Sequence, residues 1–240
     1  MAAPSSPDAI RDVNTRYHDC AAADYDAKWG IDWGPIGREQ VLGKLRKALG
    51  GAIPVFDRSL EIGAGTGYFS LHLLMAGVVG RATCTDISPG MVDALKANAE
   101  RLQLEVDARV ADAEALPFED ASFDTVTGTL VLCEADDPRR ALDEISRVLR
   151  PGGRYLFLEH VRSGDPALAR TQDRWAPIWK AFAGGCTCNR DTLATIEASG
   201  LDVQRSRMGR FPKSPKIVSP LRKPVSRVLP KGAKKPATVK

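Results

Sequence analysis

Hydrophobic positions in the first fifty residues recur at helical spacing. The pattern predicts one helix over residues 9–27 and a second over residues 37–49, with a glycine-rich break at 30–34. Gly50 follows the second helical pattern, where a glycine commonly ends a helix. The sequence therefore predicts a small helical lobe over residues 1–50.

From residue 57 onward, short apolar runs alternate with segments of helical spacing. The run over 123–132 is rich in β-branched residues, which suits a strand buried on both faces of a sheet. Such alternation predicts an α/β fold, a doubly wound sheet of mostly parallel strands joined by right-handed crossovers. Ligands then bind beyond the carboxyl ends of the strands. The expected strands are 59–62, 81–86, 106–110, 123–132 and 154–161, and the expected helices are 68–76, 91–102 and 138–149.

The pattern loosens after the fifth expected strand. Helices are expected over residues 166–182 and 191–199, and a strand over 201–206. Residues 209–240 hold ten Lys or Arg, no acid and six prolines. Because proline interrupts helices, this segment is expected to be an extended or disordered basic tail. The expected organisation is a helical lobe or lid over 1–50, a ligand-binding domain over 51–208 and a tail over 209–240.

Charge is distributed unevenly along the chain. The formal net charge is +4, from 34 basic and 30 acidic residues. Because ten of the basic residues lie in 209–240, residues 1–208 hold 24 basic and 30 acidic residues, a balance of −6. The net charge of the whole chain is therefore a poor guide to its partners.

Composition also disfavours several kinds of protein. No apolar run reaches the roughly 18 residues of a membrane span, and residues 1–8 lack the basic start and apolar stretch of a signal peptide. No second Cys or His pair completes a zinc pattern around Cys186 and Cys188. We therefore expect a cytoplasmic protein with reduced thiols and no metal site. The cysteines are Cys20, Cys84, Cys133, Cys186 and Cys188.

Three closely spaced glycines follow the first expected strand, in Leu60-Glu61-Ile62-Gly63-Ala64-Gly65-Thr66-Gly67. Glycines let the backbone turn tightly and let a ligand approach without a Cβ in the way. A dinucleotide-binding turn has the spacing G-x-G-x-x-G, whereas here the third glycine comes one residue early. The order E-x-G-x-G-x-G instead resembles the class I S-adenosylmethionine-dependent methyltransferases, whose fold is Rossmann-like.

This resemblance covers residues 55–162 and implies a binding site for S-adenosyl-L-methionine. Asp86 ends the second expected strand, about 20 residues past the glycines, and is implied as the ribose ligand. Asp112, which follows the third strand, is implied to accept from the adenine amino group. An acid at either position could instead only cap the following helix. The implied cofactor-binding residues are Glu61, Gly63, Ala64, Gly65, Gly67, Asp86, Ile87, Met91, Asp112, Ala113, Thr129 and Leu130.

The N-terminal helical lobe also offers candidates. Many small-molecule members of this superfamily use such a helix as a lid, with a tyrosine over the cofactor. Tyr17 and Tyr25 are the residues that the resemblance implies for this role. The alternative is that these tyrosines, with Trp29 and Trp33, only pack the lobe against the core.

The second half of the chain carries a narrower resemblance. It resembles the alkyl thiol methyltransferases and their bacterial relatives in the order of three segments: Thr129–Cys133, Arg147–Gly153 and Leu158–Val161. Phospholipid N-methyltransferases and quinone-pathway C-methyltransferases are a looser match. Two departures are evident: an apolar, membrane-anchoring N-terminus is absent, and the basic segment stands where the relatives have a final strand.

The implied chemistry is an in-line displacement at a methyl group, with the nucleophile aligned and water excluded. A thiol reacts as its thiolate, so a nearby base would help. His160 and Glu159, at the end of the fifth expected strand, are predicted as the catalytic pair. The alternative is that His160 is a structural residue bonded to the following helix.

The expected function is methyl transfer to a small, lipophilic acceptor, either a thiol or an O, N or C nucleophile. One alternative is a nucleic-acid methyltransferase that docks through the basic segment 209–240, and another is a binding protein without catalysis. No Asn/Asp-Pro-Pro-Tyr/Phe sequence follows the fourth strand, which weighs against DNA adenine methylation. Contact of the basic segment with an anionic membrane surface is a further alternative, and the oligomeric state is left open.

Overall fold

The structure is a computed structural model that describes residues 7–199, 201–205, 208–210, 214–222 and 225–228. The helices are α1 (Pro7–Ala21), the 3-10 helix η1 (Ala22–Asp24), α2 (Tyr25–Trp29), α3 (Pro35–Leu49), α4 (Tyr68–Met75), α5 (Pro89–Arg101), α6 (Pro138–Val148), α7 (Pro166–Phe182) and α8 (Thr192–Glu197). The strands are β1 (Phe56–Ile62), β2 (Val79–Asp86), β3 (Asp107–Val110), β4 (Phe123–Thr129), β5 (Leu149–His160), β6 (Leu201–Arg205), β7 (Met208–Arg210), β8 (Pro220–Arg222) and β9 (Val225–Val228).

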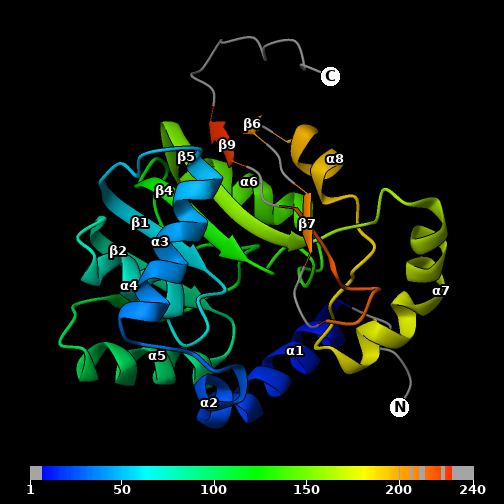
Figure 1. Cartoon of the computed structure of the whole chain (residues 1–240), viewed down its shortest axis with the longest axis horizontal. Coiled ribbons are helices and arrows are strands. Elements are labelled where there is room, and N and C mark those ends of the chain that lie inside the picture. The colour runs from blue at the N-terminus through cyan, green and yellow to red at the C-terminus, as the bar shows by residue number, and fades with distance from the viewer. Residues whose placement is uncertain (1–6, 200, 206–207, 211–213, 223–224, 229–240) are drawn as a thin grey trace.

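The sheet has a parallel part and an antiparallel part (Figure 1). Strands β3, β2, β1, β4 and β5 are neighbours in this order and run parallel. The chain therefore winds outward from β1 in one direction and from β4 in the other, which creates a switch point between β1 and β4. The predicted α/β, doubly wound sheet of mostly parallel strands is confirmed.

Helices cover both faces of the sheet and bury separate cores. On one face, α6 and α8 pack through Leu142, Ile145 and Ile196 against β1, β4 and β5. On the other, α3 and α4 pack through Val41 and Leu73. The parallel strands are thus buried on both sides, as their continuous apolar runs predict. Among the described residues, no helix is long and apolar enough to cross a membrane.

Short acid- or serine-proline sequences fix where three helices begin. Ser88, Asp137 and Asp165 each precede a proline and accept a hydrogen bond from a backbone N–H of the first turn of α5, α6 and α7. Proline is suited to the first helical position because its missing N–H has no intrahelical partner there. These caps place the first turn of α5 immediately beyond the end of β2.

Two boundaries differ from the sequence-based expectation. Strand β4 ends at Thr129, because Leu130 has φ of +63° and turns the chain out of the sheet. Strand β5 begins at Leu149, ahead of Arg150-Pro151-Gly152-Gly153. Leu149 pairs with Phe123 and Arg154 pairs with Thr125, so the four residues between them make a register shift. The apolar run over 123–132 is therefore a strand followed by a buried turn.

The expected division between a domain ending at residue 208 and a tail after it requires correction. Strand β9 pairs antiparallel with the first half of β5 and with β6, and β8 pairs with β5 at Glu159 and His160. The two valines of Val225-Ser226-Arg227-Val228 are a weak signal for β9 among the surrounding prolines and cations. The rest of the expected tail, at 211–213, 223–224 and 229–240, lies outside the described residues.

Candidate functional site

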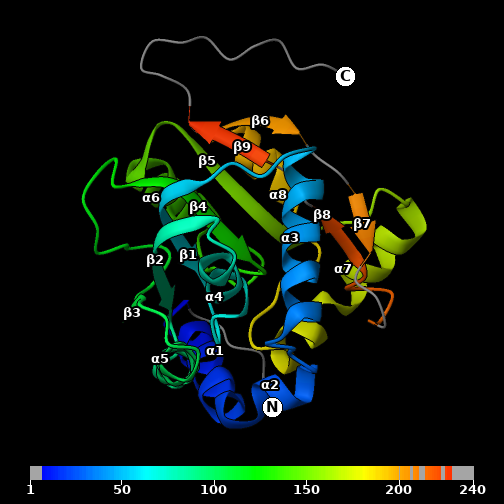
Figure 2. The ribbon, with the colours of Figure 1, turned by 60° about the vertical axis from the view of Figure 1, so that its left-hand side comes forward.

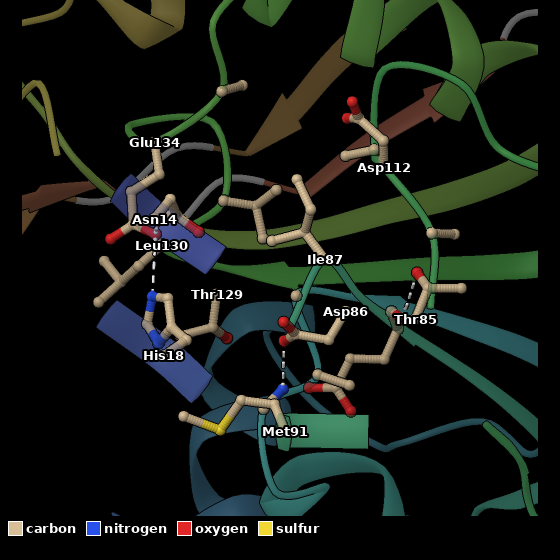
Figure 3. A pocket seen from close by; sticks show the side chains of 18 of the residues that line it. Asn14, His18, Thr85, Asp86, Ile87, Met91, Asp112, Thr129, Leu130 and Glu134 are labelled. Carbon is tan, nitrogen blue, oxygen red and sulfur yellow. Dashed lines mark hydrogen bonds and ion pairs between the residues drawn. The ribbon is translucent and has the colours of Figure 1, made fainter. Parts of the chain in front are cut away.

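A cavity of about 300 Å³ opens at the carboxyl ends of β1, β2 and β4 (Figure 3). Its walls come from the turn after β1, the start of α5, the turn after β4 and the N-terminal helices α1 and α2. The switch point of the sheet lies on this edge, where doubly wound sheets bind their ligands. Twelve of the predicted site residues line the cavity: Glu61, Gly63, Ala64, Gly65, Asp86, Ile87, Met91, Asp112, Ala113, Thr129, Leu130 and Tyr25.

Asp86, at the end of β2, is held firmly in the cavity wall. Its Oδ2 accepts from the Gly65 N–H at 2.8 Å, and its Oδ1 accepts from the Ser88 N–H at 3.0 Å. Burial raises the pKa of this carboxyl, against the opposing effect of the two backbone hydrogen bonds. Each oxygen keeps a lone pair for a ligand, so Asp86 is a fixed acceptor suited to hydroxyl groups.

The glycine turn serves two purposes at different positions. Gly63 and Gly65 have φ of +60° and +53°, and a Cβ on Gly63 would lie 2.6 Å from Val131 Cγ2. A Cβ on Gly65 would meet nothing within 4 Å, so this glycine faces open space beside the cavity. Gly67 does not line the cavity; a Cβ there would lie 2.8 Å from Leu95, so it permits helix packing instead.

Glu61 is the buried acid that precedes the glycine turn. Its carboxylate accepts from the Ser70 N–H at 3.0 Å, at the start of α4, and burial raises its pKa to about 7. Because its side chain also lines the cavity, Glu61 adds negative potential to the cavity near neutral pH.

The far end of the cavity holds an acidic group around one arginine. Arg11 of α1 lies 3.3 Å from Asp112 and 3.4 Å from Asp136. Asp112 Oδ1 accepts from the Glu114 N–H at 2.9 Å, so its Oδ2 remains available beside Arg11. Both carboxylate oxygens of Asp136 are buried without a hydrogen bond. This end therefore offers unused acceptors to a ligand.

The N-terminal lobe closes the opposite side of the cavity. Asn14 and His18 lie four residues apart on one face of α1, and Glu134 meets both, at 3.0 Å from Asn14 Nδ2 and 3.6 Å from His18 Nε2 (Figure 3). Tyr25 also lines the cavity. Tyr17 does not: it is 40% exposed and its ring lies against Gly184, so the predicted contact of Tyr17 with the cavity is wrong.

Hydrogen bonds fasten this lobe to the walls of the cavity. Asp26 accepts from Thr66 Oγ1 at 2.6 Å, in the glycine turn, and from Asn98 Nδ2 at 3.1 Å, in α5. Asp19 accepts from Ser88 Oγ at 2.5 Å and from the Gly90 N–H at 2.9 Å, at the start of α5. The lobe therefore rests on the two turns that shape the cavity.

The charge balance of the cavity favours a cationic ligand. Among the described residues that line it are six carboxylates, and the only side chains able to oppose them are Arg11 and His18. Hydrogen bonding to Glu134 and the nearby acids raise the pKa of His18 despite the opposing effect of burial, the largest single contribution. A pyrophosphate would meet strong repulsion here, whereas a sulfonium would be stabilised. The carboxylates are Glu61, Asp86, Asp112, Glu114, Glu134 and Asp136.

The sheet order, the glycine turn and the acidic cavity together define a class I S-adenosylmethionine-dependent methyltransferase domain. Residues 60–157 match the family model described as a methyltransferase domain. S-adenosylmethionine is the cofactor that the family implies, and the open space at Gly65, the fixed acceptor Asp86 and the acidic walls fit such a group.

Curated relatives share about half of the chain. The thiol S-methyltransferase TMT1B of Homo sapiens is 38% identical over 142 residues, which cover 58% of this chain and 57% of the relative. The ubiquinone/menaquinone biosynthesis C-methyltransferase UbiE of Roseobacter denitrificans is 34% identical over 122 residues, 50% of this chain and 49% of the relative. The chain thus matches about half the length of these relatives.

Solved structures share the fold over nearly the whole chain. The N-methyltransferase NodS of Bradyrhizobium japonicum, solved with S-adenosyl-l-homocysteine, has a TM-score of 0.65 at 21% identity and covers 90% of this chain and 98% of its own. The [4+2]-cyclase SpnF has a TM-score of 0.73 at 18% identity and covers 95% and 99%. The fold is thus shared with proteins named for different reactions.

The predicted catalytic pair lies behind the cavity wall. Glu159 is fully buried and accepts from the backbone N–H groups of Val131, Leu132 and Cys133, at 2.9, 2.9 and 3.0 Å. It fixes the turn after β4, and it does not line the cavity. The prediction that Glu159 meets the substrate is therefore contradicted by its position.

His160 is 9% exposed and is also absent from the cavity lining. Its Nδ1 lies 3.3 Å from Cys186 Sγ and 4.0 Å from Cys133 Sγ. Hydrogen bonds from Cys133 and His160 lower the pKa of Cys186 despite its burial. The position of His160 therefore favours the structural alternative over the role of a base in the cavity.

Sequence reasoning missed the polar residues of α1 and their partner. Arg11, Asn14 and His18 follow each other at spacings of three and four, which places all three on one helical face. That polar face was the available signal. Glu134 had no comparable signal, because it follows the buried turn after β4 and meets α1 only in the folded chain.

Proposed function

We propose that this chain is an S-adenosylmethionine-dependent methyltransferase that transfers the methyl group to a small, lipophilic acceptor, with a thiol as the first candidate. The observation that carries the proposal is the acidic cavity at the switch point, whose walls are the glycine turn and the fixed carboxylate of Asp86. When bound, the cofactor supplies a methyl group activated by a sulfonium.

The cavity lining supports a definite orientation of the cofactor. Asp86 accepts from the ribose hydroxyls, and Asp112 accepts from the adenine amino group at the end occupied by Arg11. The methionine part then lies between Thr129 and Tyr25, at the end occupied by His18 and Glu134. Residues proposed as neighbours of adenine are Ile87, Met91 and Ala113, and those proposed for the methionine part are Glu61, Gly63, Ala64, Gly65, Thr129, Leu130 and Tyr25.

A thiol acceptor is favoured by the relatives and by the charges beside the methionine end. The human relative is named a thiol S-methyltransferase. His18, whose pKa is raised by Glu134 and by other nearby acids, places a partly cationic imidazole in the wall there. A neighbouring cation stabilises a thiolate over a thiol, and the thiolate is the nucleophile.

The helical lobe, described from residue 7 onward, acts as a lid in this proposal. Asp19 and Asp26 hold the lobe on the turns at Ser88 and Thr66, so the lobe covers the cavity from which water must be excluded. Exclusion of water strengthens the attraction between the carboxylate walls and a sulfonium.

Cofactor binding is tested first, by calorimetry with S-adenosylhomocysteine on the purified full chain. Asp86→Ala is expected to weaken binding at least about 100-fold, because two hydrogen bonds to a charged acceptor are worth about 1.5 to 3 kcal/mol each. Asp107→Ala is the matched control: Asp107 lies at the opposite end of the neighbouring strand and pairs with the exposed Arg109. Equal binding by wild type and Asp86→Ala would contradict the proposed site.

Transfer is tested with methyl-labelled cofactor against alkyl thiols, phenols, amines and quinols of matched size. Label in an alkyl thiol, with little in the other classes, is the expected outcome. Label confined to amines or quinols would overturn the choice of acceptor and keep the methyltransferase. Binding of S-adenosylhomocysteine without transfer to any acceptor would favour a binding protein, or another reaction on the same fold, as in the [4+2]-cyclase.

A further inference from the structure

Behind the cavity, three segments bring two thiols and one imidazole together. Cys133 comes from the turn after β4, His160 from the end of β5, and Cys186 from the segment after α7. Their potential ligand atoms all lie within 4.8 Å of one another, and all three residues are buried. Among the described residues this is the one such group of three or more Cys, His, Asp or Glu side chains.

The spacing of these atoms suits a single small ion. Zinc binds sulfur at about 2.3 Å and nitrogen at about 2.0 to 2.1 Å, so two ligands of one tetrahedral zinc lie about 3.5 to 3.8 Å apart. The distances from His160 Nδ1, 3.3 Å to Cys186 Sγ and 4.0 Å to Cys133 Sγ, lie on either side of this range. For these two pairs of atoms, shifts of a few tenths of an ångström would reach the spacing of two ligands on one ion.

The surrounding backbone holds the three side chains in place. Glu159 accepts from the Cys133 N–H at 3.0 Å, and the Thr187 N–H donates to the Cys133 carbonyl at 2.7 Å. Arg190 Nη1 donates to the Leu132 carbonyl at 2.6 Å. Outer contacts of this kind orient metal ligands and are worth a large part of the affinity of such sites. The group is therefore preorganised by the same bonds that fix the turn after β4.

The donor set selects the kind of ion. Two thiolates and one imidazole are soft or intermediate ligands, which favour zinc or copper(I) over magnesium or calcium. Two thiolates also neutralise a divalent ion, so the loaded site adds no net charge to a neighbourhood that already holds Glu159 and Arg190. No fourth side chain joins the group in the described part of the chain, which leaves one coordination position for an exchangeable ligand.

We propose that Cys133, His160 and Cys186 form a zinc site that ties the turn after β4 to β5 and to the segment after α7. On binding, the two thiols release their protons to solvent and the imidazole binds through neutral Nδ1. Leu130 packs against the cysteines on one side and lines the cavity on the other. The ion thus lies one side chain behind the cavity wall, and its binding is independent of methyl transfer.

The test uses the full chain, stripped of metal under reducing conditions and titrated with zinc. We expect about one zinc per chain by elemental analysis, as three protein ligands and an open position provide for one ion. Cobalt substituted for zinc should give an intense thiolate-to-cobalt charge-transfer band. Absence of that band in reduced wild type would overturn the proposal, whatever the variants do.

Single variants then assign the ligands. Cys186→Ser, Cys133→Ser and His160→Gln are each expected to weaken zinc binding by more than about 100-fold (about 2.8 kcal/mol), the upper limit of what loss of an outer contact costs. Cys84→Ser and Cys188→Ser are matched controls, since both thiols are buried and neither belongs to the group. Unchanged affinity in Cys186→Ser would overturn the proposal. A Cys133–Cys186 disulfide in the isolated protein, with no zinc bound after reduction, would do the same.

Discussion

The two halves of the sheet are built by different rules. Around β1 and β2, each site residue follows its own strand directly, as Gly63 follows β1 and Asp86 ends β2. Around β5, the side chains at the strand end, Glu159 and His160, turn into the protein and hold segments from elsewhere in the chain. The first half presents its polar groups to a ligand, and the second uses them to fix the wall behind that ligand.

A polar residue at the end of a parallel strand can therefore either face the ligand or turn into the protein. Asp86 receives backbone N–H groups from the turns beside it and still faces the cavity. Glu159 receives three consecutive N–H groups from the turn after β4, and these cover it completely. The four predictions below are ordered from the largest expected effect to the smallest.

Glu159→Ala is expected to destabilise the protein at the turn after β4, which Glu159 holds against β5. Three buried N–H donors would lose their acceptor, at about 1 to 3 kcal/mol each if water does not replace it, so we expect a loss of roughly 3 to 5 kcal/mol in the free energy of unfolding. Urea unfolding measures this loss, with the exposed Glu119→Ala as control. A stable Glu159→Ala protein that lacks only activity would restore the catalytic interpretation.

Gly63→Ala is expected to disturb the first half of the sheet edge. The positive φ costs about 1 to 2 kcal/mol in a residue with a Cβ. Crowding of Val131 Cγ2 at 2.6 Å adds about 1 to 3 kcal/mol. Gly77→Ala is the control, since Gly77 has φ of +65° and free space, and should show the first cost alone. In the double variant Gly63→Ala/Val131→Ala, the stability lost through crowding should be regained. If it is not regained, crowding of Val131 is not the cause.

Glu61→Gln is expected to flatten the pH dependence of stability in the ligand-free protein. The pKa of Glu61 is about 7 in the folded protein, against an ordinary value of 4.5, so between these values the folded state binds more protons than the unfolded state. The contribution of Glu61 is therefore fully present below pH 4.5 and is lost as pH rises toward 7. Glu61 therefore changes the free energy of unfolding by at most about 1.4 kcal/mol per pH unit. Unfolding at several pH values measures it, and an unchanged slope in Glu61→Gln would contradict the assignment.

His18→Ala is expected to give the smallest effect, on the pH dependence of thiol methylation. Without the imidazolium, the acceptor thiol ionises at higher pH, so the acidic limb of kcat/KM should move upward by about one pH unit. Tyr17→Phe, one residue earlier on α1 and outside the cavity, should leave the profile unchanged. A pH profile that His18→Ala does not shift would remove His18 from the proposed acceptor site.

The sequence was most informative where structure and chemistry are both local. The alternation of apolar runs with helical spacing predicted the sheet. The resemblance carried by the glycines and the acids at the strand ends predicted eleven residues near strand ends that line the cavity. Such residues lie within a few positions of a strand end, and strand ends can be recognised from apolar runs. Tyr25 and Tyr17 could not be distinguished, because this depends on how α1 and α2 lie on α5.

Residues assembled from distant segments could not be predicted in the same way. Cys133, His160 and Cys186 are separated by 27 and 26 residues, so no local spacing suggests a metal site. The destination of Glu159 depends on the turn at Leu130, whose positive φ is not evident in an apolar run. Strand β9 was hidden by neighbouring prolines and cations, since a strand of four residues has little pattern of its own.

The attachment of α1 sets the order in which the molecule can be completed during synthesis. Asn14 donates to Glu134 and, at 2.7 Å, to the carbonyl of Gly184, which lies 170 residues further along the chain. Figure 2 shows α1 at the foot of the domain, below strands that are made long after it. The contacts of α1 with α5 can form early, but its contact with Gly184 can form only after most of the chain has been made. The residues that line the cavity end at Asp136, so its walls are complete in sequence before this last contact of α1 can be made.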